Sequence, residues 1–246
     1  MKKSAHIGTM LEISDLKKRF GDNEVLKGFN MQLKEGENLV IMGKSGSGKS
    51  VMIKCLMGLM QPDSGDIKIM GMTVFDLEQS ELDQLRKKIG FLFQGSALYD
   101  SMTVRENLEF PLRKQNMPQE EKDKLVYQAL ESVGLLDAID LLPNELSGGM
   151  KRRIALARAI ILHPKIIIYD EPTTGLDPIT AKEIIQLMRE IQHIHGSSAL
   201  IITHDVDCSR VIADRMILLI DGVNYAEGSF EELSSSTDER IQAFFK

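Results

Sequence analysis

Residues 39–57 read LVIMGKSGSGKSVMIKCLM, and this stretch decides the fold. Its first four residues form a short apolar run that is typical of a buried strand, and the residues after Ser50 have the character of a helix. Between them, residues 43–50 match the pattern G-x-x-x-x-G-K-[ST] at every position, in the strand–loop–helix context that the pattern requires. The stretch therefore predicts a loop that binds the phosphates of a nucleoside triphosphate.

The residue types of this loop suit phosphate binding. Glycines let the backbone turn so that several N–H groups point at the phosphates, and the helix N-terminus adds the positive end of its dipole. Lys49 supplies a positive charge for the β- and γ-phosphates, and the Ser50 hydroxyl is placed to bind Mg²⁺. The nucleotide-binding residues expected here are Gly43, Lys44, Ser45, Gly46, Ser47, Gly48, Lys49, Ser50 and Val51.

A second apolar run, residues 166–169, ends in two adjacent acids, Asp170 and Glu171. A carboxylate at a strand end next to the phosphate-binding loop can hold Mg²⁺ directly or through water, and this role is expected of Asp170. Glu171 then lies within reach of the attacking water and is the expected general base. The alternative is a strand that stops at a charged turn before Pro172; the phosphate-binding loop favours the metal and catalytic roles.

Composition limits the class of protein. The chain has 246 residues, 43% of them hydrophobic, so one large α/β domain with an ordinary core is expected. A net charge of −6 without a dense basic stretch argues against a nucleic-acid partner, and the short basic runs 86–88 and 151–153 are interpreted as solvated faces. No apolar run approaches a membrane span of about 18 residues, and no signal peptide is expected. The two cysteines fit a reducing compartment. We therefore expect a cytoplasmic protein whose membrane role comes through a partner.

The first two thirds of the chain contain strand patterns and then a helical segment. Residues 11–42 alternate short apolar segments with turns, which predicts a β-rich edge. A turn is expected at 62–66, before a strand over 67–69. Residues from about 101 to 142 have helical periodicity and predict an inserted helical subdomain.

The last third alternates strand, helix and strand, which implies a parallel sheet with helices on its faces. The helix is expected over 179–194, with Asp177 and Pro178 as its cap and first residue. One face of this helix is apolar and is expected to be buried: Ile184, Ile185, Met188 and Ile191.

A second candidate phosphate cradle is the segment Ser147-Gly148-Gly149, which precedes a helical stretch over 151–161. Ser147 is expected to be the N-cap of that helix. Its hydroxyl, the glycine amides and the helix dipole together form an anion site, so capping and phosphate binding are compatible. One chain with two cradles indicates that two chains close on the nucleotide together.

These motifs resemble those of the nucleotide-binding subunits of ATP-binding-cassette (ABC) transporters, and the resemblance runs from about residue 11 to residue 230. The family's motifs occur here in the family's order: Phe20, residues 43–50, Gln94, Ser147-Gly148-Gly149, Asp170-Glu171, Asp177 and His204. Seven matches in order are specific, whereas any one of them alone would not be.

The resemblance implies a role for each remaining position. Phe20 is expected to stack on adenine, and Gln94 to touch Mg²⁺ and sense a transmembrane partner. Asp177 lies in the loop that crosses to the other subunit, and His204 contacts the γ-phosphate. The expected catalytic set is Glu171, His204, Lys49 and Gln94; the expected metal ligands are Ser50, Gln94 and Asp170, with ATP and Mg²⁺ as cofactors.

The resemblance also implies the fold. We expect a P-loop nucleoside triphosphatase with a mostly parallel core sheet, an N-terminal antiparallel β-subdomain and an inserted α-helical subdomain. The whole of residues 1–246 is expected to form one ABC ATPase domain. Its expected parts are a core over about 11–93 and 165–232, a helical subdomain over about 95–164, and a short C-terminal helix over about 236–246.

One departure from the common family pattern and one further segment concern the transported substrate. The family usually has Gln after the two signature glycines, whereas this chain has Met150. Met150 and residues 92–107 are similar to the ATPases of Mla-type lipid transporters, which work with MCE proteins. Two alternatives stay open: the ATPase of an importer for small solutes, and a non-transport cassette such as an iron–sulfur assembly ATPase.

The resemblance implies partners and a location. Two copies are expected to bind two ATP molecules, each between residues 43–50 of one copy and Ser147-Gly148-Gly149 of the other. The expected partners are an integral-membrane permease, an MCE-domain protein and a small regulatory subunit, at the cytoplasmic face of the inner (plasma) membrane. A long C-terminal arm around the neighbouring subunit is not expected.

Overall fold

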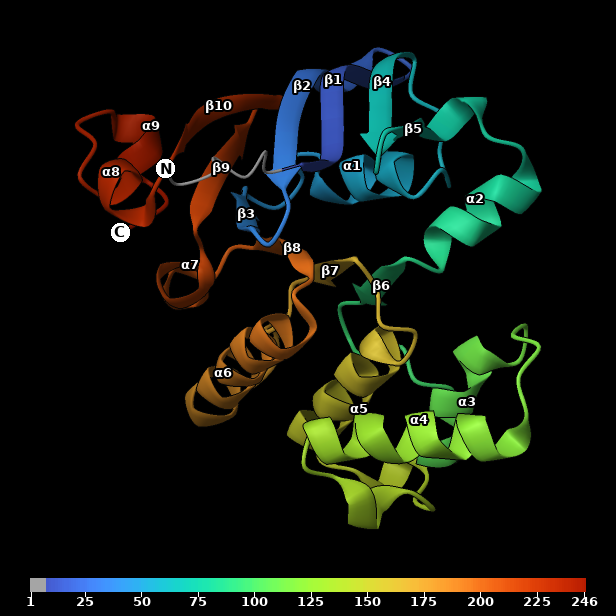
Figure 1. Ribbon diagram of the computed structural model, residues 1–246. Helices are drawn as coiled ribbons and strands as arrows, with labels where there is room; N and C mark the ends of the chain where they lie inside the picture. The colour runs from blue at the N-terminus through green and yellow to red at the C-terminus, as the bar shows by residue number, and fades with distance from the viewer. Residues whose placement is uncertain (1–7) are drawn as a thin grey trace, which may run out of the picture. The chain divides into compact units, whose positions relative to one another are not determined.

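The computed structural model describes residues 8–246, which group into two compact α/β units. Among the described residues, the first unit combines residues 8–86 with residues 197–246, and the second is residues 87–196. Figure 1 gives the order of the elements: the chain passes from the first unit into the second and returns to the first with β8 (Ser198–Thr203). Each unit has its own sheet strands and its own helices.

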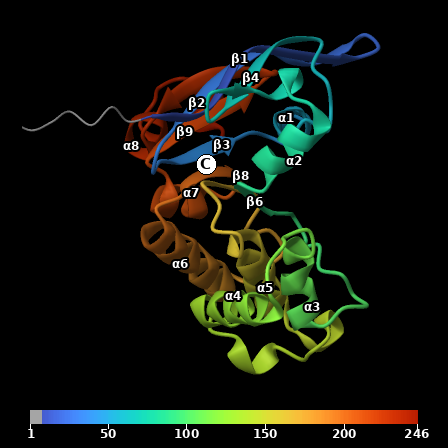
Figure 2. The ribbon, with the colours of Figure 1, turned by 45° about the vertical axis from the view of Figure 1, so that its right-hand side comes forward.

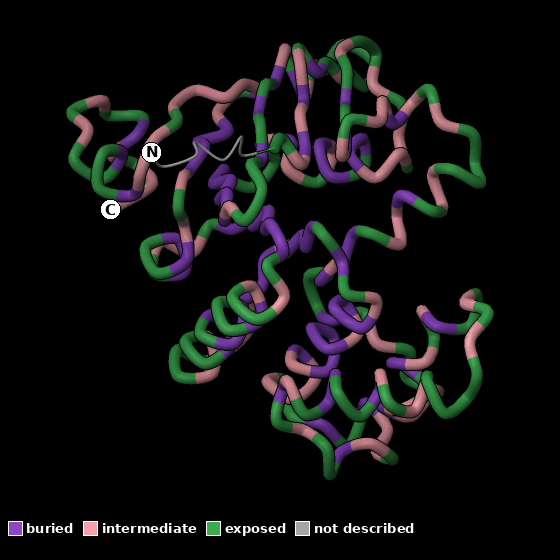
Figure 3. Tube along the Cα trace, in the orientation of Figure 1, coloured by how far each residue is buried: buried purple, intermediate pink, exposed green. Residues whose placement is uncertain are grey.

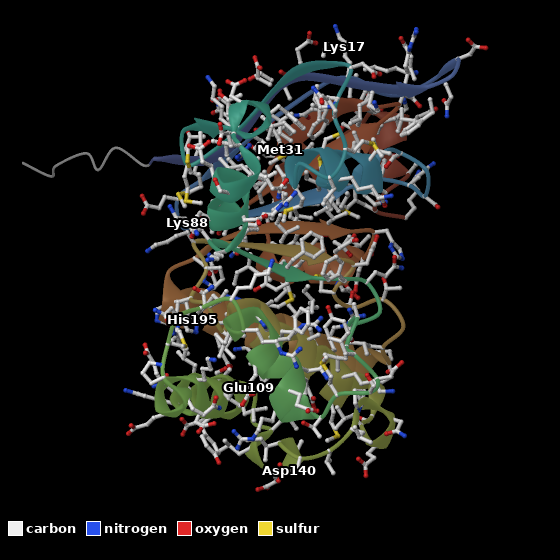
Figure 4. The ribbon with its side chains drawn as sticks, turned by 90° about the vertical axis from the view of Figure 1, so that its right-hand side faces the viewer. Lys17, Met31, Lys88, Glu109, Asp140 and His195 are labelled. Atoms are coloured by element: carbon white, nitrogen blue, oxygen red, sulfur yellow. The ribbon has the colours of Figure 1, made fainter. Side chains whose placement is uncertain are left out.

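The first unit contains an antiparallel sheet built mainly from the β-rich edge expected over residues 11–42. Its strands, in spatial order, are β2 (Asn23–Lys34), β1 (Thr9–Phe20), β4 (Ser64–Ile69) and β5 (Met72–Thr73). Along the end of β2, buried apolar residues alternate with exposed polar ones, as expected of a sheet with one face on the core. Figure 4 labels Lys17 on β1 and Met31 on β2; Lys17 is exposed and Met31 is buried.

Strand β4 begins earlier than expected, and the expected turn at 62–66 is wrong for its last three residues. Ser64 pairs with Lys17 and Asp66 with Ser14, so these residues already belong to the sheet. Gly65 allows this pairing: its φ is +93°, and a Cβ there would lie 2.4 Å from the Asp15 carbonyl oxygen. The partner strand is distant in sequence, so a local turn signal gave no sign of it.

The first unit also contains four strands of the core sheet, in the order β10 (Val223–Gly228), β9 (Arg215–Ile220), β3 (Asn38–Met42) and β8 (Ser198–Thr203). Strand β3 runs parallel to both β9 and β8, whereas β10 is antiparallel to β9. Every residue of β3 and β8 is buried, and purple marks buried residues in Figure 3. The buried strand expected at residues 39–42 is confirmed.

The helices of the first unit connect and flank these strands. They are α1 (Lys49–Leu56), α2 (Gln79–Arg86), α7 (Val206–Ile212), α8 (Phe230–Ser234), α9 (Glu239–Gln242) and a 3₁₀ turn over Val74–Asp76. Helix α9 falls within the stretch 236–246, where a C-terminal helix is expected. Cys55 and Cys208 are both buried in this unit.

The second unit pairs two parallel strands, β6 (Ile89–Leu92) and β7 (Ile166–Asp170), with a group of helices. The helices are α3 (Val104–Glu109), α4 (Gln119–Ser132), α5 (Gly148–Ile160), α6 (Pro178–His195) and 3₁₀ turns at Phe110–Leu112, Leu136–Ala138 and Pro143–Glu145. Helix α5 is central, because α3, α4, α6 and β6 all contact it. Figure 2 shows α3 and α4 packed around α5.

Helix α6 confirms the amphipathic pattern expected over residues 179–194. It begins after the N-cap Asp177 with Pro178 as its first residue, and it ends at His195. Its C-cap is Gly196, whose φ of +60° suits a left-handed conformation. The four apolar residues expected on one face are all buried: Ile184, Ile185, Met188 and Ile191. Within residues 8–246, none of the helices has the length and apolar character that a bilayer crossing would need.

Candidate nucleotide site

The phosphate-binding loop joins the end of β3 to the start of α1. Its geometry requires glycine at two positions. Gly48 has a φ of +106°, and a Cβ there would lie 3.0 Å from a Leu26 methyl carbon and 3.1 Å from the Val25 carbonyl oxygen. A Cβ on Gly43 would lie 2.4 Å from the Ser47 hydroxyl. The loop is therefore folded tightly against the start of β2, and larger residues would open it.

Helix α1 begins without a side-chain cap, because its N-cap residue is Gly48. The N–H groups of a first helical turn need partners from outside the helix, and a phosphate can supply them. Lys49 lies at the same end: its ammonium group donates hydrogen bonds to the carbonyl oxygens of Gly43 and Lys44, the latter at 3.2 Å. Backbone donors and a cation thus meet at one loop, which fits a triphosphate.

The register of the core sheet brings His204 to the same edge. Met42 pairs with Thr203 in the parallel ladder between β3 and β8, so Gly43 and His204 both follow the carboxyl ends of neighbouring strands. Ligands of open α/β sheets bind at this edge. The structure therefore joins two sequence motifs that lie about 160 residues apart in the chain.

Phe20 ends β1 and pairs with Asn23 across the hairpin. Its ring is 47% exposed, and the Lys18 ammonium lies 5.8 Å from the ring centre. An exposed ring at a hairpin end is unusual for a residue that serves only the core. Stacking on adenine stays a prediction.

The second unit gathers its own set of candidate residues at the carboxyl ends of β6 and β7. Leu92 pairs with Tyr169, so Gln94 and Asp170 come at or just after the ends of adjacent strands. Glu171 follows with a φ of +50° and is 7% exposed. The Thr174 hydroxyl donates a hydrogen bond of 3.2 Å to a carboxylate oxygen of Glu171. Left-handed backbone at a non-glycine residue is strained, and such strain concentrates at functional sites.

The signature segment, Ser147-Gly148-Gly149, lies at the start of α5, as expected. Ser147 is the N-cap, and its hydroxyl oxygen accepts a 3.2 Å hydrogen bond from the Met150 amide, so the expected cap is confirmed. A Cβ on Gly149 would lie 2.7 Å from a Thr180 methyl carbon. The segment is therefore packed directly against the first turn of α6.

Asp177 holds that first turn in place. Its carboxylate accepts hydrogen bonds from the amides of Ile179 and Thr180, at 3.0 and 3.1 Å, and from the Thr180 hydroxyl. The Thr180 hydroxyl is the main cause that lowers the pKa of the Asp177 carboxyl below its usual range, followed by the Thr180 amide. Thr180 therefore contacts Asp177, in the loop that is expected to cross to the other subunit, and also lies against Gly149.

Sequence reasoning missed one residue at the centre of this arrangement, Arg152. The basic run 151–153 was interpreted as a solvated face, and this interpretation is wrong for Arg152, which is only 3% exposed. Its guanidinium donates to the carbonyl oxygens of Phe93, at 2.9 Å, and Thr174, at 3.1 Å. Helical spacing could have predicted that Arg152 is buried, because position 152 shares a face with three buried residues: Ala155, Leu156 and Ala159.

The candidate residues thus fall into two sets according to the unit in which they lie. The first set contains Phe20, residues 43–51 and His204, and the second contains Gln94, Ser147-Gly148-Gly149, Asp170, Glu171 and Asp177. Among residues 8–246, no cluster of His, Cys, Asp and Glu is arranged to hold a metal by itself. The donors expected for Mg²⁺, a hydroxyl, an amide oxygen and one carboxylate, suit a hard cation that is bound largely through substrate phosphates.

Comparisons with known proteins agree with this geometry. The sequence profile of the ABC transporter family matches residues 26–174. The intermembrane phospholipid transport ATP-binding protein MlaF of Haemophilus influenzae is 38% identical over 238 residues, which are 96% of this chain and 90% of that protein. The methionine import ATP-binding protein MetN of Rhizobium johnstonii is 40% identical over 219 residues, which are 89% of this chain and 60% of that protein.

Solved structures give the same result. The dimeric post-hydrolysis state of the cassette MJ0796 with ADP and Pi is 36% identical, with a TM-score of 0.80 over 90% of this chain and 99% of that one. CbiO1 of Clostridium perfringens, part of the cbiONQ transporter complex, is 30% identical, with a TM-score of 0.86 over 97% of this chain and 95% of that one. The chain therefore belongs to the ABC transporter family and is one of its ATP-hydrolysing cassettes, with ATP and Mg²⁺ as cofactors.

Proposed function

We propose that this cassette powers an ABC transporter that moves phospholipid together with an MCE-domain protein. The main support is the similarity to MlaF, which extends over 96% of the chain. Met150 and residues 92–107 support it from the sequence, because both resemble the lipid-transporting subfamily. In this proposal residues 1–246 act as one ABC ATPase domain.

The proposal assigns the chemistry to the residues of the two sets. Lys49 and the amides of residues 43–51 bind the phosphates, and Phe20 stacks on adenine. Ser50, Gln94 and Asp170 hold Mg²⁺, which neutralises charge on the phosphates.

Hydrolysis then needs a base and a stabiliser of charge. Glu171 takes a proton from water as the water oxygen attacks the γ-phosphorus, and the bond to the ADP oxygen breaks. Lys49 and His204 stabilise the charge that develops on the γ-phosphoryl oxygens. Ser147, Gly148, Gly149 and Asp177 of a second copy complete the site.

The partners follow from the same proposal: a second copy, a permease, an MCE-domain protein and a small regulatory subunit. The complex lies at the cytoplasmic face of the inner membrane. Exposed aromatic residues support a permease contact near Gln94: Phe93, Tyr99 and Phe110 are 47%, 42% and 38% exposed. The rings of Tyr99 and Phe110 lie 4.5 Å apart. Apolar rings that are not covered within their own unit suit a protein partner.

The hydrolytic assignment is tested by Glu171→Gln. This variant should bind ATP as the parent chain does and lose on the order of 10²-fold or more of its turnover, because the general base is gone. ATP binding and phosphate release are measured on the same preparation. Normal turnover would remove Glu171 from the mechanism.

The substrate is tested on the membrane complex. The chain is purified with its genetic neighbours, the co-purifying proteins and lipids are identified, and ATPase activity is measured in the reconstituted complex with added phospholipid or methionine. The proposal expects a permease, an MCE-domain protein, bound phospholipid and stimulation by lipid.

Methionine import is the second candidate, because several MetN proteins match at 39–40% identity. It predicts that methionine stimulates the complex and that no MCE-domain protein co-purifies. This outcome would replace the lipid proposal and leave the ATPase assignment unchanged.

A further inference from the structure

We infer that Arg152 is a positioning residue. It fixes two segments to helix α5: the loop that contains Gln94 and the turn that contains Glu171. The inference rests on the proposed roles of Gln94 and Glu171 and adds a residue that no family motif assigns. Arg152 does not touch the nucleotide in this account. It acts through the backbone segments that carry the residues which do.

The hydrogen bonds of Arg152 reach both segments at once. One terminal nitrogen, Nη1, donates to the Phe93 carbonyl oxygen at 2.9 Å, and Phe93 directly precedes Gln94. The other, Nη2, donates to the Thr174 carbonyl oxygen at 3.1 Å. Thr174 in turn donates its hydroxyl to Glu171 at 3.2 Å. A single planar guanidinium therefore joins the start of one loop to the turn that holds the expected base.

Burying the charge of Arg152 costs free energy that a residue with only a structural role would not require. Its side chain is buried, and burial alone lowers its pKa, since no carboxylate contributes to the shift. Its Nε is buried without a hydrogen-bond partner among residues 8–246. Arg153, the next residue, instead pairs with Glu183 at 2.9 Å and donates to the Val133 carbonyl oxygen at 3.2 Å. A buried cation to which no carboxylate among residues 8–246 contributes adds little stability, so its contacts point to a positioning role.

Both segments that Arg152 holds contain strained backbone. Ser96 and Ala97, which follow Gln94, have φ values of +67° and +47°, and Glu171 has a φ of +50°. Such conformations persist only where the surroundings fix them. Arg158, on the same helix, adds a hydrogen bond of 3.1 Å to the Ser96 carbonyl oxygen. Helix α5 is thus the scaffold on which the shapes of both segments depend.

A displacement of about 1 Å in a catalytic group can cost on the order of 10²-fold in rate. Loss of Arg152 should therefore lower kcat, because Glu171 and Gln94 are no longer held. The KM for ATP should change little, since the phosphate-binding loop lies in the first unit, which Arg152 is not part of.

The test compares Arg152→Met with Arg153→Met, its neighbour on the same helix. Each change removes one guanidinium, and only the first removes the contacts to Phe93 and Thr174. For Arg152→Met we expect kcat to fall by roughly 10- to 100-fold with KM within about threefold, and a melting temperature close to that of Arg153→Met. Equal kcat values in the two variants, or a parallel rise in KM, would overturn the inference.

A second variant covers the case in which Arg152→Met does not fold. Arg152→Lys keeps the charge, but one ammonium is a point donor and does not reproduce the fork that joins two carbonyls. Its kcat should lie between those of the parent and Arg152→Met; a parental kcat would contradict the role. The Glu171→Gln variant separates the two proposals: an inactive Glu171→Gln beside a fully active Arg152 variant overturns only the inference about Arg152.

Discussion

The two glycine-rich cradles of this chain begin two helices in different ways. At α1 the N-cap is Gly48, in a left-handed conformation and without a side chain to offer. At α5 the N-cap is Ser147, whose own oxygen already accepts the Met150 amide. The first cradle also has the Lys49 ammonium within its loop, whereas the cation that follows the signature segment in the sequence is Lys151.

The difference shows a division of labour. The phosphate-binding loop presents uncapped helix N–H groups and a cation, so one copy of it suffices to bind a triphosphate. The signature segment is capped by its own serine and adds mainly a hydroxyl and a helix dipole. It is suited to add contacts to a phosphate that is already bound, as the proposed ATP site between two copies requires.

The largest expected effect concerns the lysine beside each cradle. Lys49→Ala should weaken ATP binding to the isolated chain by roughly 10- to 100-fold, the range expected for loss of a charged hydrogen bond. Lys151→Ala, beside the signature segment, should change it by less than about twofold. Titration with a fluorescent ATP analogue measures both. Similar losses in the two variants would break the comparison.

The next effect separates capping from phosphate binding at Ser147. Ser147→Asp keeps a good N-cap, so the melting temperature should be maintained, but the added carboxylate repels the γ-phosphate and ATPase activity should fall by at least about 10-fold. Ser147→Thr keeps the hydroxyl and serves as the control. If Ser147→Asp hydrolyses ATP normally, the signature segment has only a structural role.

A smaller effect concerns the backbone of the two cradles. Gly48→Ala should lower stability by about 1–2 kcal/mol, because its φ is +106° and the new methyl meets Leu26 and Val25. Gly148→Ala should change stability by less than about 0.5 kcal/mol, because its Cβ would meet only Leu176, at an ordinary 3.9 Å. Urea unfolding of both variants checks the order, and a reversed order would show that the loop is less tightly folded than described.

The smallest effect is a pH dependence at Asp177, which supports the second cradle through Thr180. Its lowered pKa means that the stabilisation is fully present above the ordinary carboxyl pKa of 3.8 and is lost as pH falls through the lowered value. Asp177→Asn keeps a cap without a titrating group. Melting curves of the parent and this variant should therefore converge as the pH falls below 3.8. A constant difference would contradict the assignment.

Local signals predicted much of the fold. Local sequence predicted three elements: the buried strand before residue 43, the helix after the phosphate-binding loop, and α6 with its Asp177 cap. Each of them is specified by residues within one short segment. The early start of β4 was not, because it depends on pairing between Ser64 and Lys17. Long-range pairing decides such boundaries, and no local pattern encodes it.

The candidate site shows the same limit. Motifs identified the residues that are expected to touch ligands, since glycines, acids and caps have fixed local spacing. They did not identify Arg152, because its guanidinium binds the carbonyl oxygens of Phe93 and Thr174, which lie far from it in the chain. A run of three cations suggests a solvated surface, and only the helical spacing of residue 152 with Ala155, Leu156 and Ala159 pointed the other way.

The most direct test of the division of labour is complementation between two damaged chains. Lys49→Ala lacks a working phosphate-binding loop, and Ser147→Asp lacks a working signature segment. In a mixed dimer, one site combines both defects and the other combines two intact cradles. ATPase activity measured on the mixture should therefore clearly exceed the sum of the two variants measured alone. A mixture no more active than that sum would contradict an ATP site that is shared between two copies.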